Sequence, residues 1–275
     1  MGEENDIEKI VNGTAEYRKK IIDLINKHEK TINNSEDFRL LSNFVFLFIG
    51  YQEEIMILQS INKFISALPL TRISLECYST IKVLVSMYKD NPIFPYHKQL
   101  TMQLLAYHDI CEEIELYLSL IKSERKKDIG IEYTKMIISD ILSVFDESYI
   151  FKKATGEISL AKTREKMEKH FEEQFPENKI PSNAFIVKEA LRNNKLMINE
   201  NGSFFNDTQY IYTELSKACH NTVCSMKERI EVEDDGTKYS SLGKAHKNNL
   251  PYMQINYNCL CDVFTEIKEL LHSSI

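Results

Sequence analysis

Long helices are the main constraint that this sequence places on its fold, because residues that break helices are scarce. The 275 residues include only 8 Gly and 6 Pro, whereas sheet-rich folds need many turns. In the first segment, about 5–32, apolar side chains recur every three or four residues, which is the spacing of an amphipathic helix. With 43% hydrophobic and 27% charged residues, the composition is that of an ordinary globular protein. We therefore expect a mainly α fold, a multi-helix bundle.

Polar residues and prolines mark where the helices are expected to begin and end. Ser35 can cap a second helix, because a serine oxygen at this position accepts a hydrogen bond from a free N–H of the first turn. Pro69 is expected to stop that helix at about Leu68, and Thr71 to cap a third helix that reaches about Lys89. Similar signals place further helices at about 96–123, 128–149, 159–175, 182–195, from Asp207, and from Pro251 to about His272.

One segment near the carboxyl end has the pattern of paired strands. Arg229–Tyr239 alternates apolar and polar residues around Asp234-Asp235-Gly236, and Asp-Gly between alternating segments is typical of a tight hairpin turn. We therefore expect a small β-hairpin inserted before the C-terminal helix. Residues 1–275 are expected to form a single helical domain, with 150–205 as a subdomain or an elaboration of it.

The charge and the cysteines favour a cytoplasmic protein without a membrane partner. The net charge of −7 disfavours non-specific binding to phosphate backbones. The longest apolar stretch, Leu40–Tyr51, has about twelve residues, fewer than the roughly 18 that a membrane span requires. The amino-terminal residues are acidic and do not resemble a signal peptide. The six cysteines follow no regular framework, so buried thiols are expected.

Two polar stripes interrupt otherwise apolar helices. Arg72 and Glu76 are four residues apart, and Tyr212, Ser216 and His220 follow one another at the same spacing. A spacing of four puts each set on one helix face. Because polar groups on partly buried faces need partners, we expect the two stripes to face each other across a single polar seam. A structural network that locks the helices together is the alternative to a functional site.

The stripes carry a resemblance to a known group of proteins. An Arg-x-x-x-Glu motif at Arg72 and Glu76, followed after a long interval by Tyr-x-x-x-Ser-x-x-x-His at Tyr212, Ser216 and His220, resembles an uncharacterised family of helical bacterial proteins. That family is loosely similar to the HEPN superfamily of helical nucleotide-binding domains and ribonucleases, many of which belong to toxin and defence systems. The resemblance implies a helical fold and a role in bacterial defence or stress response.

HEPN ribonucleases carry an Arg and a His on one helix, four to six residues apart, and act as dimers. This chain departs from that pattern at its stripes, because Arg72 and His220 are far apart in sequence. A literal match occurs at Arg164 and His170, which have five residues between them, with the polar Glu165 after the Arg. This pair is the second candidate site, and a solvated helix face is its structural alternative.

Metal ligands are not expected, and no cofactor is predicted. His220 and Cys224 are four residues apart, as two zinc ligands on one helix would be. The carboxylates of Asp109, Glu112, Glu113 and Glu115 resemble the magnesium-binding helices of all-helical pyrophosphatases. Neither set forms a complete ligand pattern, so the predicted site contains no metal.

The leading functional hypothesis from the sequence is a metal-independent ribonuclease. His220 would activate the ribose 2′-hydroxyl, Arg72 would stabilise the charge on the phosphorane, and Tyr212 and Glu76 would orient them. The expected partners are RNA or a nucleotide, together with a second copy of the chain or another protein. The alternatives are a non-catalytic protein-interaction module and a nucleotide-binding sensor that recognises phosphate through Arg72.

Overall fold

The described residues are mainly helical, which confirms the expected fold class. The computed structural model describes residues 2–61, 64–89, 98–122, 127–175, 180–182, 185–187, 190, 212, 215–216, 230–232, 238–240 and 250–273. These residues fall into two compact units, one made of Met1–Ile93 with Val187–Ile275 and the other of Phe94–Ile186. Each unit is described by itself. The expected single domain over 1–275 and the elaboration at 150–205 stay predictions.

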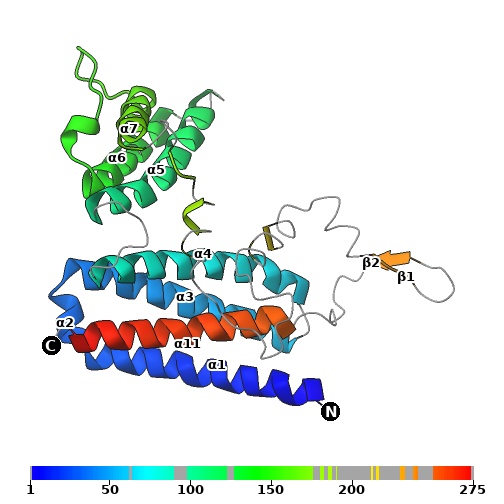
Figure 1. The fold of residues 1–275 in the computed structure, drawn as a ribbon. Helices are drawn as coiled ribbons and strands as arrows, with labels where there is room; N and C mark the ends of the chain where they lie inside the picture. The colour runs from blue at the N-terminus through cyan, green and yellow to red at the C-terminus, as the bar shows by residue number, and fades with distance from the viewer. Residues whose placement is uncertain are drawn as a thin grey trace. The chain divides into compact units, whose positions relative to one another are not determined.

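Four long helices form the first unit (Figure 1). They are α1 (Gly2–Lys27), α3 (Glu36–Ser60), α4 (Phe64–Tyr88) and α11 (Leu250–Ser273), and a short α2 (Glu29–Asn33) follows α1. Helix α3 packs on α4, and α11 packs on both α1 and α4. The helices α1, α4 and α11 run in one direction and α3 in the other (Figure 1). Fully buried apolar side chains fill the core between them, among them Ile21, Phe48, Ile55, Leu75, Tyr78, Ile81 and Leu84.

The helix boundaries confirm one predicted cap and correct two predictions. Ser35 caps α3, because its hydroxyl oxygen accepts a hydrogen bond from the N–H of Phe38 at 3.3 Å. The predicted stop at Pro69 is wrong, since α3 already ends at Ser60 and Pro69 lies inside α4. Pro69 is the sixth residue of α4, where a proline removes one backbone hydrogen bond, and the helix nevertheless continues past it to Tyr88. Thr71 is likewise no cap: its hydroxyl donates to the carbonyl of Ala67 at 3.0 Å within α4.

Among the described residues of the second unit are three long helices and a short 3₁₀ turn. They are α5 (Lys98–Lys122), α6 (Lys127–Val144), η1 (Glu147–Tyr149) and α7 (Leu160–Gln174). Helix α5 packs on both α6 and α7. The buried face of α7 consists of Leu160, Thr163, Met167 and Phe171, and its spacing of three and four matches the helical period. A loop joins η1 to α7, and it turns at Gly156, whose φ is 82°.

Two short strands precede α11 in the chain. Strand β1 (Ile230–Val232) pairs antiparallel with β2 (Lys238–Ser240), with Glu231 opposite Tyr239. The predicted turn at Asp234–Gly236 lies outside the described residues. The hairpin as a whole therefore stays a prediction.

Helix α3 is apolar along most of its length. Within the described residues, Asp37–Ser60 is long and apolar enough to cross a membrane by length and composition. Of its 18-residue apolar stretch, 39% is buried inside the protein. The core helix of a globular bundle has the same composition. Phe48 and Ile55 are buried in the first unit, as expected of such a helix.

Candidate functional site

The first half of the predicted seam is an ion pair on one face of α4. The guanidinium Nη2 of Arg72 lies 3.0 Å from the carboxylate Oε1 of Glu76, one helical turn further on. Both side chains are partly open to solvent, with 25% of Arg72 and 34% of Glu76 exposed. At this exposure the pair alone contributes only about 0.3–0.5 kcal/mol to stability. The seam therefore depends on what else contacts the pair.

Tyr212 completes the seam from a distant part of the chain. Its hydroxyl donates a hydrogen bond to the same Oε1 of Glu76 at 2.8 Å, across 136 residues of sequence. Its ring faces the guanidinium of Arg72, with 5.7 Å between the guanidinium carbon and the ring centroid, a distance at which a cation and a ring attract each other. Tyr212 is only 4% exposed. Arg72, Glu76 and Tyr212 thus meet, as the spacing of the two stripes led us to expect.

The seam keeps Tyr212 protonated at neutral pH. Burial raises the pKa of Tyr212, and the hydrogen bond to Glu76 raises it further, against an opposing effect from Arg72. A tyrosine in this environment donates a hydrogen bond and does not act as a base. Its role in the seam is therefore to hold the Glu76 carboxylate.

The rest of the second stripe contributes less to the described seam. The hydroxyl of Ser216 donates to the carbonyl of Tyr212 at 2.9 Å, a bond within one helical turn. Ser216 therefore bonds to its own helix. His220, the residue to which the ribonuclease hypothesis assigns the base, lies outside the described residues.

The second candidate pair, Arg164 and His170, contacts two different neighbours in the second unit. Arg164 on α7 forms an ion pair with Glu115 on α5, with 2.6 Å between Nη1 and Oε1. The ring of His170 packs edge-on against Tyr149, with 5.2 Å between the centroids. No interaction is recorded between Arg164 and His170 themselves among the described residues. These contacts attach α7 to α5 and to η1.

A neutral polar layer that was not predicted from the sequence lies in the core of the first unit. The amide Nε2 of Gln52 on α3 donates to the hydroxyl of Ser74 at 2.6 Å and to Oδ1 of Asn256 on α11 at 3.3 Å. Nδ2 of Asn256 in turn donates to the hydroxyl of Thr71 on α4 at 3.3 Å. None of these four residues is more than 3% exposed. The signal that could have identified them is an uncharged polar residue on the apolar face of each helix.

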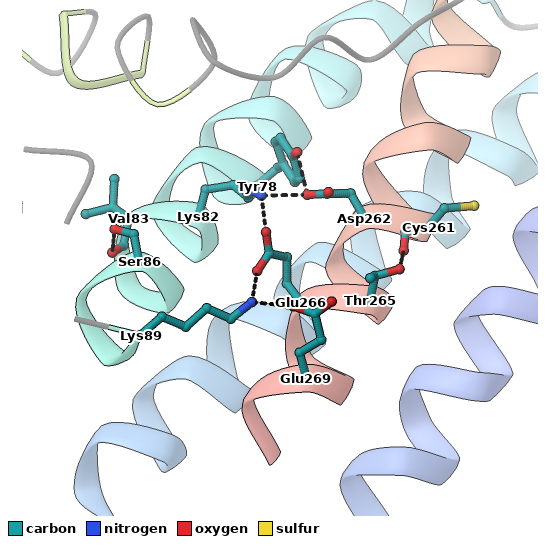
Figure 2. A network of polar contacts seen from close by, with 10 residues as sticks. All are labelled: Tyr78, Lys82, Val83, Ser86, Lys89, Cys261, Asp262, Thr265, Glu266 and Glu269. Atoms are coloured by element: carbon teal, nitrogen blue, oxygen red, sulfur yellow. Dashed lines mark hydrogen bonds and ion pairs between the residues drawn. The ribbon is translucent and has the colours of Figure 1, made fainter. Parts of the chain in front are cut away.

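An ionic ladder between α4 and α11 was also missed (Figure 2). Lys82 lies 2.9 Å from Asp262 and 2.5 Å from Glu266, and Lys89 lies 2.6 Å from Glu266. Fully buried Tyr78 donates its hydroxyl to Asp262 at 2.8 Å. Burial lowers the pKa of Lys82, but Asp262 and Glu266 outweigh this effect and the net pKa is raised. The ladder is therefore charged at neutral pH and fastens α11 to α4.

The potential metal ligands considered from the sequence form no cluster in the described part of the chain, and His220 and Cys224 lie outside it. No three His, Cys, Asp or Glu side chains of the described residues could hold a metal ion together. Cys77, Cys111 and Cys259 are buried free thiols, and Cys261 is a half-buried one. Burial raises the pKa of Cys77 to about 12, so that this thiol is neither a ready metal ligand nor a nucleophile.

No protein-family model matches the chain, and neither a curated protein nor a solved structure matches it. The functional assignment therefore depends on the residues of this chain alone.

Proposed function

We propose that this protein is a HEPN-like helical protein of bacterial defence or stress response that cleaves RNA without a metal ion. The observation that supports the proposal is the meeting of Arg72, Glu76 and Tyr212, while 25% of the Arg72 side chain stays accessible. A guanidinium held by a carboxylate and an aromatic ring suits a phosphate, because its planar fork matches two phosphate oxygens. RNA offers such a phosphate beside a 2′-hydroxyl.

In the proposed reaction His220 removes the proton of the 2′-hydroxyl, and the 2′-oxygen attacks the adjacent phosphorus. The bond from phosphorus to the 5′-oxygen breaks, and the leaving oxygen takes up a proton. Arg72 stabilises the charge on the phosphorane, and Glu76 and Tyr212 hold its guanidinium in place. The products are a 2′,3′-cyclic phosphate and a 5′-hydroxyl.

The proposal makes a geometric demand on the segment that carries His220. His220 comes eight positions after Tyr212, which would amount to about 12 Å along the axis of a continuous helix. His220 can then reach a phosphate bound to Arg72 only if the segment after Tyr212 runs toward Arg72.

The test is RNA cleavage in the presence of EDTA by the purified chain and matched variants. His220→Ala and Arg72→Lys should each reduce cleavage by about 100-fold or more. Ser216→Ala is the control, because the hydroxyl of Ser216 bonds only to the carbonyl of Tyr212 in the described contacts, and it should cleave like wild type. Cleavage that EDTA abolishes, or that survives both substitutions, would overturn the proposal.

A non-catalytic interaction module is the second candidate, and one observation favours it. A single oxygen, Oε1 of Glu76, receives both Arg72 and the hydroxyl of Tyr212, so the charges of the seam are largely balanced within the chain. This candidate predicts that His220→Ala lowers the melting temperature and that wild type leaves RNA intact. A nucleotide sensor, in contrast, would show a melting temperature that rises with nucleotide concentration.

Three further parts of the proposal come from the sequence and its resemblance. They are the β-hairpin at Arg229–Tyr239 before α11, assembly as a homodimer, and a cytoplasmic location. HEPN ribonucleases act as dimers, so sedimentation of the purified chain tests the second part directly. If a strictly monomeric chain cleaves RNA, one site is enough for the reaction and the homodimer is not required.

A further inference from the structure

Two histidines meet where α1 and α11 end side by side. His28 follows the last residue of α1, and His272 lies in the last turn of α11. Their rings lie edge to face, with 6.0 Å between the centroids. Both helices run in the same direction (Figure 1), so the last turn of α11, which carries partial negative charge, lies beside His28. This end of the first unit therefore favours a cation.

His28 has a polar atom that needs a partner. The residue is only 8% exposed, and its Nε2 is buried without a hydrogen-bond partner among the described residues. Leaving such an atom unpaired is unfavourable, and a bound ion is one species that can satisfy it.

The ring of His272 is held in the form that binds a metal. Its Nδ1 lies 2.6 Å from the carbonyl oxygen of Lys268. Because a carbonyl only accepts hydrogen bonds, Nδ1 must carry the hydrogen, and the neutral ring then has its lone pair on Nε2. Metal-binding histidines commonly donate their other ring nitrogen to a carbonyl in this way, since the bond fixes the tautomer.

We propose that His28 and His272 together bind a divalent transition-metal ion of the zinc or nickel type. Zinc binds an imidazole nitrogen at roughly 2.0–2.1 Å, so two rings that share one ion have centroids roughly 4.5–6.5 Å apart, about 5 Å for a tetrahedral ion, and the observed 6.0 Å lies at the wide end of this interval. His272 is exposed, which leaves the remaining coordination positions open to water. The ion would join the ends of α1 and α11. This proposal is independent of the seam at Arg72.

The test is titration of the full chain with Zn²⁺, and separately with Ni²⁺, by calorimetry, with native mass spectrometry to count bound ions. His272→Ala should remove one ion or weaken its binding by more than about tenfold. The control is His170→Ala, because His170 is also a partly exposed histidine but packs on Tyr149 in the other unit, and it should bind like wild type.

A second substitution and a second measurement make the test robust. His28→Gln should weaken binding to the same degree, and its far-ultraviolet circular dichroism checks that the chain is folded. Zn²⁺ should raise the melting temperature of wild type but not of His272→Ala. The proposal is wrong if His272→Ala binds the same number of ions with the same affinity as wild type.

Discussion

Two polar clusters hold α4 against α11, and they differ in depth and in chemistry. The layer around Asn256 is at most 3% exposed and contains only amides and hydroxyls. The ladder around Lys82 lies nearer the surface, with Lys82 12% and Asp262 28% exposed, and consists of full charges. Burying a charge costs far more than burying a hydrogen-bonded amide. The depth at which a cluster is buried therefore decides whether neutral or charged groups can hold α4 and α11 together.

The two clusters should also respond differently to the solvent. Hydrogen bonds between neutral groups in the core depend little on salt or pH, whereas ion pairs near the surface are screened by salt and weaken when a partner changes charge. Four predictions test this contrast, beginning with the largest expected effect.

Removing the central amide of the buried layer should be the most damaging single change. Asn256→Ala leaves Gln52 and Thr71 without the partner that they share, and we expect unfolding to become easier by about 2–4 kcal/mol. Urea denaturation measures the change. Gln254→Ala is the control, because its amide bonds only one turn away to Asn258, and it should cost less than about 0.5 kcal/mol. Equal losses for the two variants would contradict the buried layer.

Breaking the ladder should cost less than breaking the layer, and the cost should depend on salt. Lys82→Met leaves Asp262 and Glu266 near each other without their shared cation, which should destabilise the chain by about 1–3 kcal/mol. High salt should remove part of the stability that the ladder gives wild type. The difference in the free energy of unfolding between wild type and Lys82→Met should therefore narrow. Lys20→Met provides the surface comparison, because its pair with Glu16 is exposed, and it should leave stability nearly unchanged.

The ladder should also give the chain an acid-sensitive component of stability. Burial raises the pKa of Glu266, but hydrogen bonds from Lys82 and Lys89 outweigh it, and the net pKa lies below the ordinary value of 4.5. A lowered folded-state pKa contributes stability above the unfolded value, and this stability is lost as the pH falls through the folded pKa. Wild type should therefore lose the stability that this group contributes as the pH falls below about 4.5.

Glu266→Gln isolates this acid-sensitive component. The variant cannot titrate at this position, so its stability should fall less steeply than that of wild type between about pH 4.5 and pH 3. Urea midpoints across this range give the comparison, and identical slopes would show that other carboxyl groups account for the acid sensitivity.

The contrast between the clusters also explains what could be predicted from the sequence. Helical periodicity and the cap at Ser35 depend on neighbours within a few residues, so they could be predicted locally. The end of the second helix could not be placed from Pro69, because this proline is the sixth residue of α4 and the helix continues past it. Local sequence signals predict the presence of a helix more reliably than they predict the residue at which it ends.

The polar contacts also divide into those that could be predicted from the sequence and those that could not. The meeting of Arg72, Glu76 and Tyr212 could be expected, because two polar stripes on apolar helices each needed partners. The ladder could not, because Lys82 and Asp262 are 180 residues apart and charged side chains spaced along a helix are usually solvated. The pairing depends on how α11 packs on α4, which one sequence does not specify by local pattern.

The seam lies between the two extremes and gives the smallest expected effect. Tyr212 is 4% exposed, like the buried layer, whereas Glu76 is 34% exposed, like the ladder. Tyr212→Phe removes only the hydroxyl, and because water can reach the freed carboxylate, the loss should be about 0.5–1 kcal/mol. Thermal unfolding in low and in high salt measures it, and Ser216→Ala is the control. A loss above about 2 kcal/mol would mean that Glu76 depends on Tyr212 as a buried charge does, and the seam would then belong with the core of the bundle and not with its surface.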